Sequence, residues 1–202
     1  MITATLGLLT IWTASAQEPS ALDTQDPKGN DGAFVYVNAE TARLEMFIAT
    51  WNVTERHFNT KGKVIATVKG TEEITWVLDR YAIRRNYTTS TDKAVYRAIG
   101  MLSFDDARDK YEAVWFDNAS KIGPSIFVGE WNDDTKTMTF SSEMPNADSS
   151  TTQLKVVERF LDAQRRLATT YQIDGGTVVK RLEVEYKRAA PCPAKIRGVF
   201  SP

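Results

Sequence analysis

The stretch ARLEMFIATWNVTERHF, residues 42–58, decides the fold. Its first part spaces apolar residues roughly as a helix does, over about two turns, which is too short for a helix that stands alone. From Trp51 onward apolar and polar residues alternate, which is the period of a β-strand with one buried face. The stretch therefore predicts a short helix, held by packing as a plug or lid, that leads directly into a first strand.

Short strand patterns bounded by turn residues fill the chain that follows. They cover residues 51–58, 64–77, 81–88, 94–104, 110–116, 125–131, 136–142, 153–161, 166–173 and 178–187. Connections this short join antiparallel neighbours, because a parallel crossover needs about a dozen residues or more. Closing such a meander removes its exposed edges. We therefore expect an all-β fold, a closed or nearly closed antiparallel up-and-down barrel of about ten strands with a short N-terminal helix.

Two of the predicted turns share one pattern, at residues 104–111 and 131–138. In each, an aromatic residue ends a strand, and Asp or Asn side chains that follow bond their own backbone to make the turn. Neither cluster has the ligand spacing of an EF-hand loop, with its Gly and distal Glu. We interpret both as solvated hairpin turns and predict no metal site.

Composition limits the classes of protein to which the chain can belong. Its 202 residues carry 25 Lys and Arg against 26 Asp and Glu, and 42% are hydrophobic, which suits one soluble domain. Because no basic stripe is present, we do not expect nucleic-acid binding. The single cysteine, Cys192, cannot form an internal disulfide.

The N-terminus predicts export. Residues 2–12 form an uncharged, mostly apolar run, and Ala14-Ser15-Ala16 supplies the small residues of a cleavage site. We predict a signal peptide at residues 1–16, cut before Gln17, and an exported protein, periplasmic or secreted. The run is shorter than the roughly 20 residues that span a bilayer, so no integral membrane segment is expected in the mature chain. Residues 17–39 are predicted to be a flexible linker, and residues 189–202 a C-terminal tail.

Several motifs resemble those of the DUF1579 family of uncharacterised bacterial proteins. LEMFIATW at residues 44–51 is similar to the family's LxxFxGTW opening, with Ala49 in place of the usual Gly. Further similarities, with Ser103 in place of a second Gly, lie at residues 76–81, 100–105, 115–117 and 129–138. The resemblance covers about residues 40–188, the predicted domain. It implies a calycin-like barrel of the lipocalin type, but no agreed activity, cofactor or catalytic residues.

Alternation selects candidate residues for the barrel interior. If Trp51 fills the barrel floor, Glu55 and His57 on the same face of the first strand point up the lumen, unless the barrel ends near His57 and both are solvated at the rim. Tyr111, Trp115 and Asp117 form a second candidate inward row.

A third inward row depends on the register of residues 80–87. It contains either Arg84 or its neighbour Arg85, and either guanidinium would fix an anionic head group in a pocket walled by Trp51 and Trp115. Small barrels are also filled by their own side chains, so a filled interior without a pocket remains an equal alternative.

The function we expect is binding of a small apolar or amphipathic ligand in the barrel. The alternatives are a structural or protein-interaction barrel with a filled core, a haem-binding barrel that uses His57, and an unknown enzyme. Haem-binding barrels of the nitrobindin type carry their His near the C-terminal strands, where this chain has none. A paired acid and base would require a cavity that joins Glu55, His57 and Asp117. We assign no catalytic residue, metal or cofactor, and leave the oligomeric state open.

Overall fold

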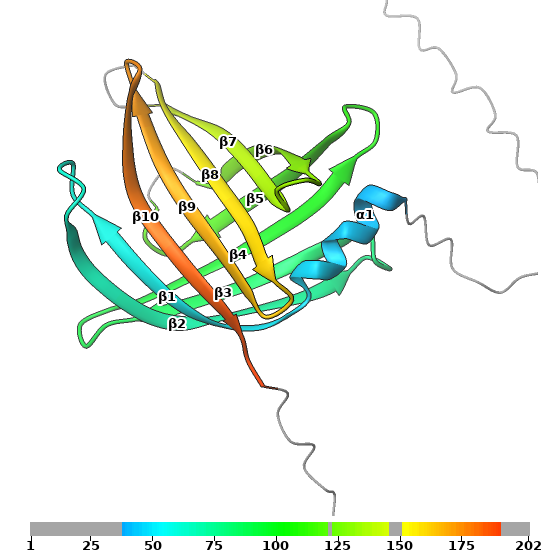
Figure 1. Cartoon of the computed structure of the whole chain (residues 1–202), viewed down its shortest axis with the longest axis horizontal. Coiled ribbons are helices and arrows are strands. Elements are labelled where there is room, and N and C mark those ends of the chain that lie inside the picture. The colour runs from blue at the N-terminus through cyan, green and yellow to red at the C-terminus, as the bar shows by residue number, and fades with distance from the viewer. Residues whose placement is uncertain (1–37, 121–122, 146–150, 191–202) are drawn as a thin grey trace, which may run out of the picture. The chain divides into compact units, whose positions relative to one another are not determined.

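The structure is a computed structural model that describes residues 38–120, 123–145 and 151–190 (Figure 1). The predicted signal peptide, residues 17–37 of the predicted linker and residues 191–202 of the predicted tail, with Cys192, lie outside the described residues. Within the described part of the chain, no helix is long and apolar enough to cross a membrane.

A short helical segment precedes the first strand, as predicted. The Asn38 side chain accepts a hydrogen bond from the backbone N–H of Thr41 at 2.6 Å and so caps the N-terminus of α1 (Ala39–Arg43). A 3-10 turn, η1 (Leu44–Phe47), continues the segment and buries its first and last residues completely or nearly so. Because the segment is too short to be stable alone, the packing of these two side chains on the barrel interior holds it in place.

Ten antiparallel strands follow and close into a barrel, which confirms the predicted fold class. They are β1 (Ala49–Phe58), β2 (Val64–Val77), β3 (Ala82–Ser90), β4 (Val95–Asp105), β5 (Lys110–Asp117), β6 (Ser125–Asn132), β7 (Thr137–Pro145), β8 (Thr151–Asp162), β9 (Arg165–Asp174) and β10 (Thr177–Arg188). Each strand pairs with its neighbours in sequence, and β1 also pairs with β10 to close the ring. At that closure Trp51 lies opposite Arg188.

The predicted turn chemistry is confirmed in both hairpins. The Asp105 carboxylate accepts hydrogen bonds from the backbone N–H groups of Ala107 at 2.9 Å and Arg108 at 3.2 Å. The Asn132 side chain accepts one from the N–H of Thr135 at 2.9 Å. These bonds satisfy backbone donors that the strand ladder leaves unpaired, so the short polar side chains fix where each hairpin reverses.

An apolar plug of buried side chains fills the end of the barrel at which β1 begins and β10 ends, where η1 leads into β1. Its buried side chains come from η1 and from most of the strands: Leu44, Phe47, Trp51, Ile74, Ile83, Leu102, Phe104, Tyr111, Met138, Phe140 and Phe160. The Trp51 indole N–H donates to the Phe47 carbonyl at 2.8 Å, which ties the first strand to the helical segment. The plug therefore closes one end of the lumen.

Candidate functional site

A ring of buried ion pairs lies on the inner face of the barrel between the plug and the rest of the lumen. Arg85 of β3 bonds Glu72 of β2 at 2.7 Å and Glu158 of β8 at 3.2 Å, and Arg166 of β9 pairs with the same two carboxylates. All four side chains are at most 12% exposed. Two acids and two bases thus alternate in a closed circuit, which we call the ionic ring.

The ionic ring is electrostatically balanced. Burial alone would raise the pKa of Glu72, but the adjacent Arg85 and Arg166 guanidinium groups outweigh burial and hold that pKa below its usual value. The Arg166 guanidinium also stacks on aromatic rings of the plug side, 4.8 Å from the Trp51 centroid and 3.7 Å from that of Tyr186. These contacts compensate for the burial of four charged side chains.

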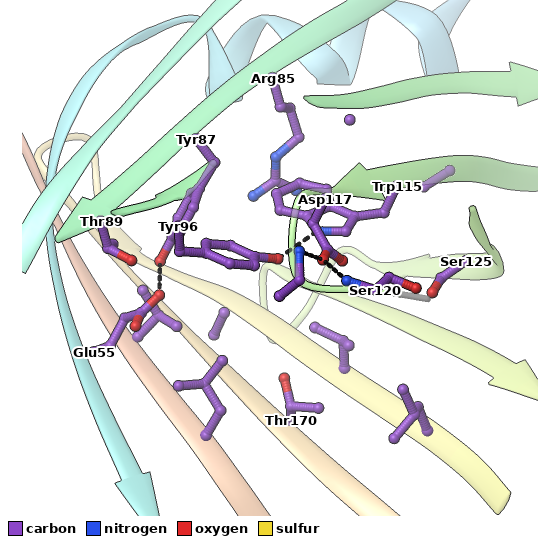
Figure 2. A pocket seen from close by; sticks show the side chains of 18 of the residues that line it. Glu55, Arg85, Tyr87, Thr89, Tyr96, Trp115, Asp117, Ser120, Ser125 and Thr170 are labelled. Atoms are coloured by element: carbon purple, nitrogen blue, oxygen red, sulfur yellow. Dashed lines mark hydrogen bonds between the residues drawn. The ribbon is translucent and has the colours of Figure 1, made fainter. Parts of the chain in front are cut away.

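Beyond the ionic ring the barrel is hollow, with a cavity of about 820 Å³. One side of the cavity is apolar and comes mainly from β6 to β10: Phe127, Met144, Leu154, Val156, Leu182 and Val184. The other side comes from β1, β3, β4 and β5 and carries the polar and aromatic groups: Glu55, His57, Tyr87, Tyr96, Trp115 and Asp117. Figure 2 shows the polar side, with Arg85 at its edge. We call these two surfaces the apolar wall and the polar wall.

Glu55 is the centre of one hydrogen-bonded group on the polar wall. Its carboxylate accepts a bond from the Tyr87 hydroxyl at 2.6 Å, drawn in Figure 2, and lies 2.9 Å from Nε2 of His57. The Glu55 hydrogen bond raises the pKa of His57 above its ordinary value of 6.5, against the opposing effect of partial burial. Burial raises the pKa of the Tyr87 hydroxyl, so that Tyr87 remains a donor.

A second group on the polar wall contains Trp115, Tyr96 and Asp117. The Trp115 indole N–H donates to the Tyr96 hydroxyl at 3.1 Å. Burial, together with the nearby Asp117 carboxylate, raises the pKa of Tyr96 to about 12. One oxygen of Asp117 also accepts the backbone N–H groups of Ala119 and Ser120, at 2.8 and 2.6 Å. The carboxylate is therefore oriented by the turn that follows β5.

Gly100 makes room for this wall. A Cβ atom at that position would lie 2.7 Å from the Trp115 ring, so the glycine lets the indole lie against the backbone of β4. Trp115 in turn meets Tyr87 edge to face with ring centroids 5.8 Å apart, and Tyr87 meets Tyr96 at 6.1 Å. The three rings form a continuous aromatic surface beside the carboxylates.

The structure separates the residues that alternation alone grouped. It places Glu55, His57, Trp115 and Asp117 on the cavity, whereas Trp51 and Tyr111 are buried in the plug. Arg84 lies on the outer face of β3, exposed, with its Nε 3.0 Å from the Asn86 side chain. The neighbouring Arg85 points inward instead, because Ile83 and Tyr87 share its parity and are buried.

Sequence reasoning missed Glu72, Glu158, Arg166 and the hydroxyl group of Tyr96, whereas Tyr87 lay in the same alternative inward row as Arg85. The available signal was parity: Glu72 alternates with Ile74 on β2, and Glu158 alternates with Phe160 on β8. A charged residue in phase with buried apolar ones predicts a buried partner of opposite sign. That partner cannot be identified without knowing which strands face each other across the lumen.

The residues around the cavity could serve acid–base chemistry or ligand binding. Glu55, His57 and Asp117 share one cavity, which is the geometric condition for an acid and base pair. Among the described residues, no group of three or more His, Cys, Asp and Glu side chains gathers in a way that would hold a metal ion. The dominant feature is the hollow itself, whose volume of about 820 Å³ lies in the range of small-molecule sites.

Comparison with known proteins shows the fold and the family. Rv2717c from M. tuberculosis is similar over 76% of this chain and 99% of its own, with 13% identity and a TM-score of 0.57. The S-type phycobiliprotein lyase CPES from Guillardia theta is similar over 80% of this chain and 100% of its own, with 13% identity and a TM-score of 0.51. At these identities the likeness is one of fold alone. No curated protein matches the chain.

The model of a protein family, described as a protein of unknown function (DUF1579), matches residues 37–188. That range takes in α1, η1 and all of the strands, and so includes both the ionic ring and the two walls of the cavity. The chain is therefore a member of the DUF1579 family.

Proposed function

We propose that the barrel binds a small apolar or amphipathic molecule in its cavity. The observation that carries this proposal is the division of the lumen into a filled end and a hollow end of about 820 Å³. Ligand sites in proteins are typically concave, mostly apolar and equipped with a few polar groups that fix orientation. The apolar wall and the polar wall of this cavity supply those two elements.

The filled-core alternative does not account for the hollow end. Protein interiors are packed to the density of organic crystals, and a void forfeits the dispersion contacts of the side chains that line it. The barrel is densely packed in the plug, where large apolar side chains contact one another, but it is hollow beyond the ionic ring. A cavity that is kept open at this cost supports a binding function.

We also infer that the protein is exported. The support is the apolar run at residues 2–12 and the small residues before Gln17. A binding barrel in that location would meet molecules from outside the cytoplasm.

Titration with Nile red, a neutral dye whose emission rises in apolar surroundings, tests the proposed binding. We expect saturable binding to the wild-type protein and at least about a tenfold weaker affinity for Ala113→Trp, which places an indole into the cavity. Phe116→Trp on the same strand is the matched control, because residue 116 faces outward and is 51% exposed. Circular dichroism melts check that both variants fold.

The two variants give the experiment a clear negative result. If the wild-type protein shows no saturable binding, or if Ala113→Trp and Phe116→Trp lower the affinity equally, the dye does not enter the cavity and the proposal fails. Native mass spectrometry of the protein purified from its own host gives a second measurement, in which a retained small molecule would appear as added mass.

A further inference from the structure

The charges that line the cavity restrict which ligand it accepts. The described side chains on its walls include three carboxylates, Glu55, Asp117 and Glu158, against one guanidinium, Arg85, and one imidazole, His57. Glu72 and Arg166, which complete the ionic ring, add one charge of each sign and cancel. The described lining therefore carries a net charge of about −2 with His57 neutral and about −1 with His57 protonated.

Arg85 is the only ammonium or guanidinium group among the described residues of the lining, and each of its three nitrogens already donates to a carboxylate. Its Nε donates to Glu72 at 2.7 Å, and its two terminal nitrogens donate to the oxygens of Glu158 at 3.2 and 3.3 Å. A ligand carboxylate or phosphate would either share Arg85 with two buried carboxylates of the same charge or displace one of them and leave it unpaired. The expectation from sequence that an arginine fixes an anionic head group is therefore not supported by the geometry around Arg85.

Asp117 is the carboxylate on the lining that no basic side chain of the described residues offsets. Glu158 is paired with Arg85, and Glu55 lies against His57. Asp117 accepts hydrogen bonds from the backbone N–H groups of Ala119 and Ser120 and from the Tyr96 hydroxyl, which orient its carboxylate without supplying a full positive charge. Its neighbours on the polar wall are Tyr96 and Trp115 (Figure 2).

We infer that the cavity selects a cationic amphiphile, a molecule with an apolar body and a protonated amine or quaternary ammonium end. This inference rests on the proposed function. The cation lies against Asp117 and the rings of Trp115 and Tyr96, which combine charge attraction with cation–π attraction. The apolar body lies along the apolar wall. An anionic amphiphile of the same length meets Glu55, Glu158 and Asp117 with no free cationic partner.

Competition against Nile red with three ligands of equal chain length tests the inference: decyltrimethylammonium, decanol and decanoate. We expect the cation to bind most tightly, the alcohol next and the carboxylate most weakly, with roughly tenfold or more between the cation and the carboxylate. Asp117→Asn keeps the side-chain oxygen that the turn needs and removes the charge. It should weaken decyltrimethylammonium binding by about fivefold or more and leave decanol binding within about twofold.

Glu112→Gln is the matched control, because it removes one negative charge from the outer face of the same strand, where Glu112 pairs with Arg108. It should leave all three affinities unchanged. Equal or tighter binding of decanoate, or an unchanged order in Asp117→Asn, overturns the inference while decanol binding still supports the proposed function. If no ligand displaces the dye, including decanol, the proposed function fails as well.

Discussion

Nε2 of His57 lies 2.9 Å from the carboxylate of Glu55, two residues earlier on the same strand. Residues two apart on a strand share a face, so local geometry alone brings this acid and base together. Tyr87, on β3, donates a hydrogen bond to the other oxygen of Glu55 at 2.6 Å and so fixes the orientation of the carboxylate. Because the chain has a single histidine, any imidazole signal reports on this pair.

The first prediction concerns the protonation of His57. Its hydrogen bond to Glu55 raises its pKa above 6.5, so an NMR titration of the imidazole protons should give a midpoint above that value. In Glu55→Gln the carboxylate charge is lost, and the midpoint should fall toward 6.5. The same midpoint in both proteins would show that the pair does not form in solution.

The second prediction is the pH dependence of stability that follows from the same pair. A group whose folded pKa is raised contributes stability that is fully present below its unfolded pKa, near 6.5, and is lost as the pH rises through the folded pKa. Replacing His57 by Asn should therefore lower the urea midpoint more at about pH 5.5 than at about pH 8.5. A larger loss at the higher pH would contradict this sign.

The third prediction tests the ionic ring. Arg166→Met removes one base and leaves two buried carboxylates to share Arg85. We expect the free energy of unfolding, measured with urea, to fall by about 3–5 kcal/mol, the cost of breaking a buried ion pair from one side.

A double variant separates charge imbalance from lost packing. Arg166→Met combined with Glu158→Gln leaves the neutral pair Arg85 and Glu72. It should be more stable than Arg166→Met alone, because no excess carboxylate remains buried. If the loss of unfolding free energy in the double variant equals the sum of the losses measured in Arg166→Met and in Glu158→Gln, the four side chains do not act as an electrostatic unit.

The fourth prediction concerns the contact between Gly100 and Trp115. Gly100→Ala would put a methyl group 2.7 Å from the indole, so the ring must shift toward the cavity. We expect a loss of about 1–3 kcal/mol in unfolding free energy and weaker Nile red binding. Ile99→Ala, at an exposed outward position of the same strand, should change dye binding little. Equal effects of the two substitutions would argue against the contact.

The fold could be predicted from sequence because its signals are local. Strand β2 has the same bounds in the prediction and in the structure, since alternation and flanking turn residues mark both of its ends. The hairpin turns were predicted equally well because Asp105 and Asn132 bond the backbone within three residues of themselves. The closure of β1 against β10 followed from the cost of leaving two edges exposed.

The site was less predictable because whether a residue lines the cavity depends on its position along the barrel axis as well as on which face of the strand carries it. Tyr111 and Trp115 share one face of β5, yet one is in the plug and the other is on the cavity. Alternation distinguishes inside from outside but does not say where the filled part of the lumen ends. The choice between Arg84 and Arg85 needed the register of β3, and the partners of Arg85 lie on β2 and on the distant β8.

The ionic ring also favours the correct strand register when the barrel assembles. Glu72 and Arg85 belong to one hairpin, β2 with β3, and Glu158 and Arg166 to another, β8 with β9, so each hairpin carries one charge of each sign. When the hairpins meet across the lumen, each acid finds the base of the other. A slip of one residue in either hairpin would turn its charges outward and leave the acid and base of the other hairpin with only each other, each having lost one of its two buried partners. A barrel with a shifted register is therefore less stable, because it loses ion pairs between the plug and the cavity.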